Sequence, residues 1–259
     1  MQRDTDAGHP AVSVVLPAYN CAGYISNSVT SIVEFFRANG LSGEVLVVDD
    51  GSIDGTCEQV PRLNAVKVIR LPANRGKGFA VRTGMNKAVG KVKIFTDADI
   101  PYGLPFITTV LYHVIQRGFH AVIGDRSLPQ STYRQPRLMR RLASKSASFL
   151  FRTLITGGYG DTQCPVKGFR AEVADEVFKM AKLDSFTFDL EIVYLMLKYN
   201  LDIKRIPVTA RNIAPGTLNI FLESARALCD VVRIYSNSHS GAYRNERLRA
   251  VAERGTPRK

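Results

Sequence analysis

The sequence predicts an α/β protein with a doubly wound, mostly parallel sheet, helices on both faces of that sheet, and an amphipathic helical extension at the C-terminus. Short apolar runs rich in Val and Ile alternate, from residue 12 to residue 125, with longer segments whose apolar residues recur at helical spacing. Buried strands that alternate with helical crossovers are typical of parallel sheets. A length of 259 residues is enough for one such domain with a small appendage.

The elements follow from these patterns in chain order. The first apolar run stops at Pro17, and the first helical segment stops at Asn39 and Gly40, a common end for a helix. Strands are predicted at residues 12–16, 44–48, 66–71, 92–96, 121–124 and 203–208. Helices are predicted at residues 26–38, 76–89, 104–117, 171–180, 188–199 and 218–234, with a short helix that opens at residues 54–56.

One main domain is predicted at residues 11–212, followed by an amphipathic helix at residues 213–238 and a basic, flexible tail at residues 239–259. Within the main domain, residues 126–160 are predicted to form a basic amphipathic insert. Residues 126–152 contain seven Lys or Arg and no Asp or Glu, and several of their apolar residues share one helical face. We expect this acid-free stretch to meet an anionic partner.

The whole chain is basic, with a formal net charge of +12 and a pI of about 9.7. Such an excess favours nucleic acid, an anionic membrane surface or a phosphorylated substrate as partner. A nucleic-acid-binding protein is a remote alternative, because the basic stretch lacks interleaved aromatic residues and matches no nucleic-acid motif. No apolar run approaches the roughly 20 residues that span a bilayer, and the N-terminus lacks the apolar core of a signal peptide. We therefore expect a cytoplasmic protein or one that attaches peripherally to a membrane.

Acidic residues follow two of the predicted strands. Asp49 and Asp50 come after the second strand, and Asp97 and Asp99, separated by Ala98, come after the fourth. Ligands of such sheets bind beyond the carboxyl ends of the strands. Two carboxylates one residue apart suit Mg²⁺ or Mn²⁺, which takes oxygen ligands and shares them with substrate phosphates. The alternative is that the pair caps the next helix or faces solvent.

Asp49 and Asp50 suit a different task. A carboxylate at that position can accept a hydrogen bond from a base N–H or a ribose hydroxyl, and we expect Asp49 to read the base and Asp50 to bind ribose or metal. The following Gly and Ser also suit a turn, and the two interpretations coexist. Further along, Gly76 and Lys77 open a helix whose N-terminus suits an anion, although the spacing matches neither a Walker loop nor a dinucleotide motif.

Several motifs together carry a family resemblance. They are VVLPAYN (14–20), VVDDGSIDGT (47–56), NRGKGFAVRTGM (74–85), FTDADIP (95–101), GDR (124–126) and DTQCPVKGFR (161–170). In this order they resemble the family 2 glycosyltransferases of the GT-A fold, and most of all the polyprenyl-phosphate branch with the dolichyl-phosphate glucose and mannose synthases. The resemblance runs from about residue 12 to residue 234.

The resemblance implies an inverting hexosyltransferase that moves a sugar from a nucleotide sugar, UDP-glucose before GDP-mannose, to a polyprenyl or dolichyl phosphate. It implies a donor site made of Pro17, Tyr19, Asp49, Asp50, Lys77, Asp97, Ala98 and Asp99. Asp97 and Asp99 would hold the metal. Arg126, Arg140 and, on a looser alignment, Arg211 would bind the acceptor phosphate. Asp99, Arg126 and Arg140 are the residues expected to be catalytic.

The acceptor decides whether a general base is needed. A lipid phosphate is already anionic at pH 7, so the site needs cations to orient it and metal to stabilise the leaving diphosphate. A hydroxyl acceptor would need a base, and Asp189 lies near the position where alcohol-using relatives place theirs. Asp189 could equally be a first-turn acid favoured by the helix dipole. We expect peripheral attachment to the cytoplasmic face of a membrane through the basic stretch and the tail.

The chain also departs from the family pattern. Cys21 stands where the family usually has Glu, and Pro165 and Val166 replace a usual Gly-Phe pair. Pro101 stands where the mannose synthases can supply a Gln to the metal. The expected metal shell is therefore completed by water or by the donor.

Overall fold

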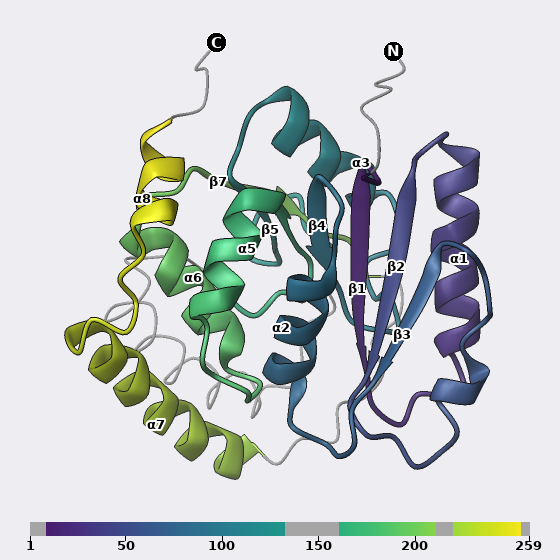
Figure 1. The fold of residues 1–259 in the computed structure, drawn as a ribbon, viewed down its shortest axis with the longest axis horizontal. Helices are drawn as coiled ribbons and strands as arrows, with labels where there is room; N and C mark the ends of the chain where they lie inside the picture. Colours follow the sequence, from purple (N-terminus) through teal and green to yellow (C-terminus); the bar gives the residue numbers. More distant parts are fainter. Residues whose placement is uncertain (1–8, 133–160, 211–219, 255–259) are drawn as a thin grey trace.

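The computed structural model describes residues 9–132, 161–210 and 220–254, and the side chains of the helix that begins at residue 220 from residue 226 onward. Most of the basic insert, with Arg140, lies outside the described residues, and so does Arg211. The described chain forms a central sheet with helices on both faces (Figure 1), which confirms the predicted α/β architecture.

In the described ranges the sheet has seven strands in the order β3-β2-β1-β4-β6-β5-β7. The strands are β1 (Val12–Ala18), β2 (Gly43–Asp49), β3 (Val66–Arg70), β4 (Val92–Phe95), β5 (Ala121–Asp125), β6 (Lys167–Arg170) and β7 (Ile203–Pro207). All neighbouring pairs are parallel except those of β6, which runs antiparallel to β4 and β5.

Strand β6 was not among the predicted strands. Its four residues read KGFR, which is neither an apolar run nor a clean alternation, so no local pattern marks it. Its pairing comes from its tertiary position between β4 and β5, where Lys167 lies opposite Phe95 on one side and Ile123 on the other. The described sheet is thus mostly parallel with one reversed strand in its interior.

Two hydrophobic clusters cover the two faces of the sheet, as the alternation along β1 requires: Val14 and Leu16 belong to one cluster and Val15 to the other. Helices α1 (Ile25–Ala38) and α3 (Phe106–Leu111), which continues into a π-helical turn (Tyr112–Gln116), pack on the first face. Helices α2 (Lys77–Lys87), α5 (Ala171–Met180) and α6 (Phe188–Lys198) pack on the second. A short 3₁₀ helix (Cys57–Gln59) follows β2.

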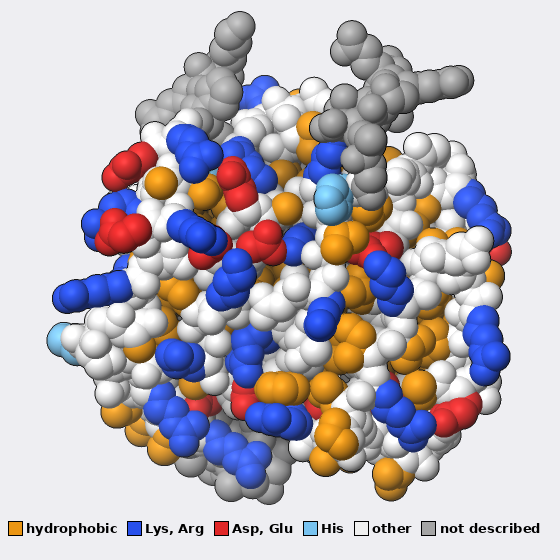
Figure 2. All heavy atoms as spheres, in the orientation of Figure 1, with side chains coloured by type: hydrophobic (Ala, Val, Ile, Leu, Met, Phe, Trp, Pro, Cys, Tyr) orange, Lys and Arg blue, Asp and Glu red, His pale blue; other side chains and the backbone are white. Residues whose placement is uncertain are grey.

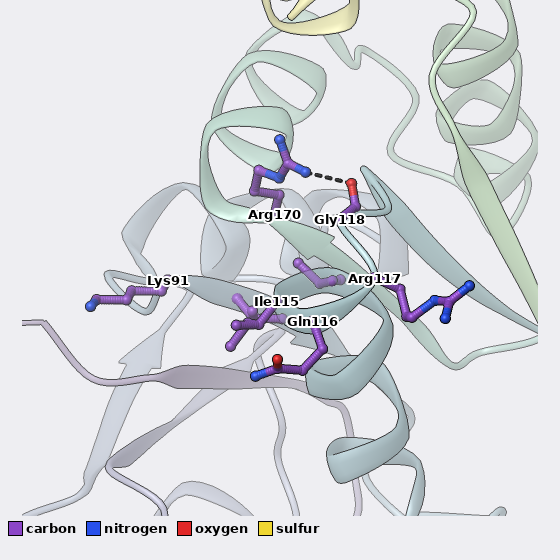
Figure 3. Close-up of a pocket in the computed structure, with 8 residues that line it drawn as sticks. Lys91, Ile115, Gln116, Arg117, Gly118 and Arg170 are labelled. Carbon is purple, nitrogen blue, oxygen red and sulfur yellow. Dashed lines mark hydrogen bonds between the residues drawn. The ribbon is translucent and has the colours of Figure 1, made fainter. Parts of the chain in front are cut away.

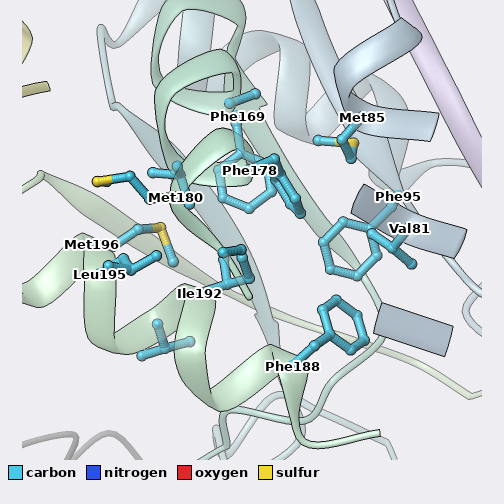
Figure 4. Close-up of a cluster of buried hydrophobic side chains, with 14 of the residues drawn as sticks. Val81, Met85, Phe95, Phe169, Phe178, Met180, Phe188, Ile192, Leu195 and Met196 are labelled. Atoms are coloured by element: carbon cyan, nitrogen blue, oxygen red, sulfur yellow. The ribbon is translucent and has the colours of Figure 1, made fainter. Parts of the chain in front are cut away.

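Aromatic side chains join β4 to the helices of the second face (Figure 4). The ring of Phe95 lies 6.3 Å from Phe169 of β6, 6.2 Å from Phe178 of α5 and 5.6 Å from Phe188 of α6, measured between centroids. Aromatic pairs at these separations attract each other beyond their buried area. The last residue of β4 is therefore packed directly on the first turn of α6.

The C-terminal part of the chain turns back onto the domain. After α7 (Ile220–His239), α8 (Glu246–Glu253) begins at a cap in which the Asn245 side chain accepts a 2.9 Å hydrogen bond from the Leu248 amide. Tyr243 and Leu248 are fully buried, and Val251 nearly so. The expected flexible tail is therefore wrong for residues 240–254, because a capped helix with an apolar stripe packs against the core. In the described residues, no helix is both long enough and apolar enough to cross a membrane.

Candidate active site

Strands β1, β2, β4 and β5 end at one edge of the sheet, and polar residues follow each of them. In the parallel register Ala18 lies beside Asp49, and Val15 beside Phe95, so the loops after these strands emerge together. In Figure 1 this edge is at the bottom, and the N-terminus is at the top. The edge therefore gathers the loops that carry most of the predicted donor residues.

Asp97 and Asp99 lie on the loop after β4, where a lysine reaches one of them. Lys77 Nζ lies 2.5 Å from Asp97 Oδ1, with the two side chains 18% and 35% exposed. Loss of surrounding water and then the charge of Asp97 raise the pKa of Asp99. Two carboxylates that repel each other at the rim of a site favour a divalent cation between them.

The chemistry of this pair fits Mg²⁺ or Mn²⁺, since it offers hard oxygen ligands and leaves other coordination positions for phosphate oxygens. In the described parts of the chain, this edge included, no group of three or more His, Cys, Asp or Glu side chains is placed to hold a metal. Asp97 and Asp99 are two carboxylates at this edge that could hold a divalent ion together with phosphate oxygens.

Helix α2 begins at Lys77, and the backbone before it needs glycine. Gly76 has a φ of 101°, and a Cβ at this position would collide with the carbonyl oxygen of Asp184. The segment around Asp184 thus sits against the start of α2. The N-terminal end of the helix adds its positive dipole to the lysine charge, and both favour an anion such as a diphosphate.

Lys77 keeps its charge in spite of its burial. Burial alone would lower its pKa, but the carboxylates of Asp97, Asp189 and Asp99 raise it above the ordinary value. The Phe186 ring lies 5.7 Å from Lys77 Nζ, within the range of a cation–π contact. The ammonium group is therefore held between carboxylates and an aromatic ring.

Asp49 is the buried carboxylate at the end of β2. Its Oδ1 accepts a 3.0 Å hydrogen bond from the Ser52 amide, and Arg70 Nε lies 3.8 Å from Oδ2. That Oδ2 is buried and accepts no hydrogen bond from any described residue. A buried acceptor without a hydrogen-bond donor costs free energy, so Asp49 Oδ2 has unused capacity to accept a hydrogen bond.

Asp50 is committed to the backbone of the loop before α2. Its two oxygens accept hydrogen bonds from the Arg75 amide at 2.8 Å and the Gly76 amide at 2.9 Å. Burial raises the pKa of Asp50, and these two hydrogen bonds oppose that shift. The carboxylate expected to bind ribose or metal thus ties the end of β2 to the start of α2.

The remaining donor residues line the same edge. Pro17 lies in β1, Ala98 is buried between the two acids of the β4 loop, and Tyr19 is 49% exposed. Tyr24, which sequence reasoning missed, lies close enough for Asp99 and Asp97 to act on it: burial and Cys21, then these two acids, raise its pKa to about 12. Only its position in the same loop as Tyr19, between β1 and α1, could have suggested it.

Arg126 follows β5 and is bound by an acid that was not expected in the site. Its Nε and Nη2 donate to the two oxygens of Asp161 at 2.6 and 2.7 Å. Burial would raise the pKa of Asp161, but the hydrogen bonds and charge of Arg126 lower it below the ordinary value. Asp161 therefore already balances part of the charge of Arg126.

Asp189 lies in the first turn of α6 and is paired inside the protein. Its Oδ1 is 2.5 Å from Lys167 Nζ, and the two side chains are 4% and 0% exposed. Burial raises the pKa of Asp189, and the charges of Lys167 and Lys77 oppose that shift. Sequence reasoning named Asp189 as an alternative base but missed Lys167. Nothing in the local sequence shows that a lysine in an unrecognised strand is buried.

A separate hollow lies at the opposite edge of the sheet (Figure 3). Among the described residues, its lining includes Lys91, Arg117 and Arg170 and no acidic residue. The labelled cations point away from one another, and Arg170 donates a 2.5 Å hydrogen bond to the carbonyl of Gly118. This hollow therefore has neither the carboxylates nor the converging charges of the edge described above.

Solved structures with the same architecture are glycosyltransferases. Glucosyl-3-phosphoglycerate synthase from Mycobacterium tuberculosis, solved with Mn²⁺, UDP and glucosyl-3-phosphoglycerate, matches with a TM-score of 0.66 at 19% identity, over 87% of this chain and 80% of that one. Mannosyl-3-phosphoglycerate synthase from Rubrobacter xylanophilus matches with a TM-score of 0.58 at 19% identity, over 96% and 77%. The fold is that of the GT-A glycosyltransferases.

The family follows from the sequence comparison. The family model "Glycosyl transferase family 2" matches residues 13–178, which is more than half of the chain. The protein therefore belongs to glycosyl transferase family 2 and is a glycosyltransferase.

Named relatives are similar over most of their length. The dolichyl-phosphate beta-glucosyltransferase of Dictyostelium discoideum is 29% identical over 86% of this chain and 73% of its own. The human protein of the same name is 28% identical over 95% and 81%. The resemblance noted from the motifs is thus confirmed at the level of the family and these relatives.

Proposed function

We propose that the protein transfers glucose from a nucleotide diphosphate sugar to a polyprenyl phosphate such as dolichyl phosphate, with inversion at the anomeric carbon. One observation carries the proposal: Lys77, Asp97 and Asp99 meet at the carboxyl end of β4, beside a helix N-terminus. This arrangement suits a diphosphate together with a divalent ion. The names of the similar dolichyl-phosphate beta-glucosyltransferases support the sugar and the acceptor.

The donor's base would be read by Asp49. The buried Oδ2, which accepts no hydrogen bond from the described chain, can accept an N–H from the base, and Pro17 and Tyr19 would line the same pocket. Uracil and guanine both carry such an N–H, so UDP-glucose is favoured over GDP-mannose by the relatives rather than by this contact. Asp50 would act by holding the loop before α2 in place.

Asp97 and Asp99 would hold Mg²⁺ or Mn²⁺, which when bound neutralises charge on the leaving diphosphate. Lys77, at the N-terminus of α2, would bind the same diphosphate from the protein side. Lys77, like the ion when it is bound, would act on charge that grows as the bond to the sugar breaks, and would thus stabilise the transition state more than the bound donor.

The acceptor phosphate would be collected by Arg126, Arg140 and Arg211. Arginine can bind two phosphate oxygens at once, and an anionic phosphate attacks without a base. The burial of Asp189 against Lys167 supports this acceptor over a hydroxyl, because a general base must reach the proton that it removes. Asp161 would orient Arg126 for this role.

The protein would meet its lipid substrate by peripheral attachment to the cytoplasmic face of an anionic membrane. Figure 2 shows Lys and Arg side chains spread across the face that it draws. On α7, Leu228 and Val232 are 50% and 62% exposed, and the neighbouring Arg233 is also exposed. An exposed apolar pair beside basic residues suits the boundary between lipid headgroups and acyl chains.

The test is transfer itself. Purified protein is incubated with radiolabelled UDP-glucose or GDP-mannose, MnCl₂ and dolichyl phosphate in detergent, and the organic extract is counted. We expect the label from UDP-glucose to enter the lipid fraction, and Asp99→Ala to abolish this. Label that reaches only water-soluble acceptors, or none, would contradict the proposal.

A further inference from the structure

We propose that Lys167 is a positioning residue for the nucleotide donor, which it affects through Asp189 and Lys77. The inference rests on the proposed function and adds to it a residue on the one strand that runs against the sheet. Lys167 Nζ lies 2.5 Å from Asp189 Oδ1 and 2.7 Å from the carbonyl oxygen of Cys164, and the side chain is completely buried. A buried ammonium in this setting has a fixed position and fixed partners.

Lys167 lies beside the last residue of β4, just before the loop that carries Asp97 and Asp99. It lies opposite Phe95 in the pairing of β6 with β4, and Phe95 is the last residue of β4 before that loop. Its Nζ is also 5.4 Å from the centre of the Phe95 ring. The Phe95 ring in turn packs on Phe188, the residue next to Asp189. Lys167 thus contacts both the strand that leads to Asp97 and the helix that carries Asp189.

The start of α6 is packed against the start of α2. A Cβ on Gly78 would lie 2.7 Å from Phe188 Cβ and 2.6 Å from the Leu183 carbonyl oxygen, so the two helix starts touch without space between them. Lys77 precedes Gly78 and Asp189 follows Phe188. Fixing Asp189 through Lys167 therefore also fixes the turn from which Lys77 extends.

Charge makes the same connection. Lys77 forms an ion pair with Asp97. Among the neighbouring carboxylates, Asp189 has the second-largest charge effect on the pKa of Lys77, after Asp97. If Asp97 turns to a metal, its bond to Lys77 weakens. Asp189 is then the buried carboxylate that still attracts Lys77. The pair formed by Lys167 and Asp189 would keep Lys77 in place when the donor is bound.

The chain offers a matched control. Lys93, in β4, is nearly buried and lies 2.5 Å from Asp175 Oδ1, whose side chain is 41% exposed. Lys93 pairs opposite Phe169, away from the loop of Asp97. The experiment compares Lys167→Met/Asp189→Asn with Lys93→Met/Asp175→Asn, so that neither variant leaves a buried charge alone. Calorimetry measures the Kd for UDP and for GDP with MnCl₂, and the nucleotide that the wild type binds more tightly is used throughout.

We expect the Lys167 double variant to raise this Kd, and the KM for the sugar nucleotide, by about tenfold, while the Lys93 double variant changes either by less than about twofold. A second comparison tests the route through Lys77. Lys77→Met should raise the Kd by about tenfold in the wild type but by less than about threefold in the Lys167 double variant, because the two changes disturb one network. A merely structural Lys167 would leave the cost of Lys77→Met unchanged.

Equal Kd values for the two double variants, or an equal cost of Lys77→Met in both backgrounds, would overturn the inference alone. A wild type that binds neither nucleotide would overturn the proposed function, and the inference with it. If the Lys167 double variant does not fold, Lys167→Arg takes its place with the same expectations, because it moves the positive charge relative to Asp189 without leaving either buried charge unpaired.

Discussion

Asp161 holds the guanidinium of Arg126 with two hydrogen bonds of 2.6 and 2.7 Å and also accepts the Arg126 amide at 2.9 Å. The two residues are 35 positions apart, and the pair joins the end of β5 to the segment before β6. Parallel hydrogen bonds between arginine and carboxylate fix direction as well as distance. The guanidinium of Arg126 is therefore oriented by the protein itself.

Asp161→Asn should destabilise the fold and misplace Arg126. The loss of a buried, bidentate partner is expected to lower the free energy of unfolding by about 2–3 kcal/mol at pH 7, since hydrogen bonds to charged groups are the strong ones. Urea unfolding measures this loss, and the KM for dolichyl phosphate should rise as well. The matched control is Glu58→Gln, whose partner Arg70 is exposed, as is Glu58; it should change the free energy of unfolding by less than about 1 kcal/mol.

The same pair predicts a pH dependence. The pKa of Asp161 is lowered in the folded protein, so its stabilisation is fully present above the unfolded pKa of about 4 and is lost as the pH falls through the folded pKa. The difference in unfolding free energy between the wild type and Asp161→Asn should therefore be constant from pH 7 to pH 5 and shrink below pH 4. A difference that grows on acidification would contradict the assignment.

Gly78→Ala should disturb the contact between α2 and α6. The added methyl group would meet the Leu183 carbonyl and Phe188 at well under 3 Å, so one of the helix starts must move. Overpacking of this kind costs about 1–3 kcal/mol. Gly78→Ala should therefore lower the Tm in thermal unfolding and raise the KM for the sugar nucleotide. Gly23→Ala is the control, because a Cβ at Gly23 meets nothing within 4 Å.

Asp99→Ala should remove metal-assisted binding of the donor. Asp99 shares the proposed ion with Asp97, and one carboxylate is a poor site for Mg²⁺ or Mn²⁺. In a thermal-shift assay, UDP-glucose with MnCl₂ should raise the Tm of the wild type and leave that of Asp99→Ala unchanged. Asp202→Asn, at the opposite edge beside His120, should respond like the wild type. An equal shift for Asp99→Ala would exclude Asp99 as a metal ligand.

The fold could be predicted because its signals are local. Apolar runs and helical spacing mark β1, β2 and the helices that cross between them, and the acids after β2 and β4 stand where parallel strands end. Strand β6 could not be found in this way, because its burial comes from its neighbours in space and not from its own residues. The helix α8 was missed for a different reason: its Asn245 cap is a local signal hidden in a basic, polar sequence.

The candidate site likewise contains residues that the sequence reveals and residues that it does not. Asp97 and Asp99 are recognisable from their spacing, whereas the roles of Asp50 and Asp161 depend on amides and a guanidinium that are distant in the chain. No spacing rule could pair Lys167 with Asp189, because one lies on the missed strand and the other on a helix. The sequence alone did not reveal which charged or polar group pairs with each of these side chains.

Asp189→Asn and Arg140→Ala separate the two acceptor classes. With a lipid phosphate, Asp189 is not a base, so Asp189→Asn should raise the KM for the donor and lower kcat by less than about tenfold. Arg140→Ala should then lower transfer to dolichyl phosphate by at least about tenfold, the cost of a lost charged contact to phosphate. A hydroxyl acceptor with Asp189 as its base predicts the reverse, with a loss of about 10²-fold or more in kcat for Asp189→Asn.

Membrane attachment should depend on anionic lipid and on the exposed face of α7. In flotation with vesicles that contain phosphatidylserine, the wild type should float at low salt and less at high salt, because each basic residue near the surface adds about 1 kcal/mol that salt screens. Replacing both Leu228 and Val232 with Asp should reduce flotation without lowering the Tm, since both side chains are at least half exposed. Arg247→Ala, on α8, is a single-charge control. Equal flotation with neutral and anionic vesicles would rule out an electrostatic contribution to membrane binding. No flotation at either salt concentration would rule out attachment of the protein by itself, because neither charge nor apolar contact would then hold it to lipid.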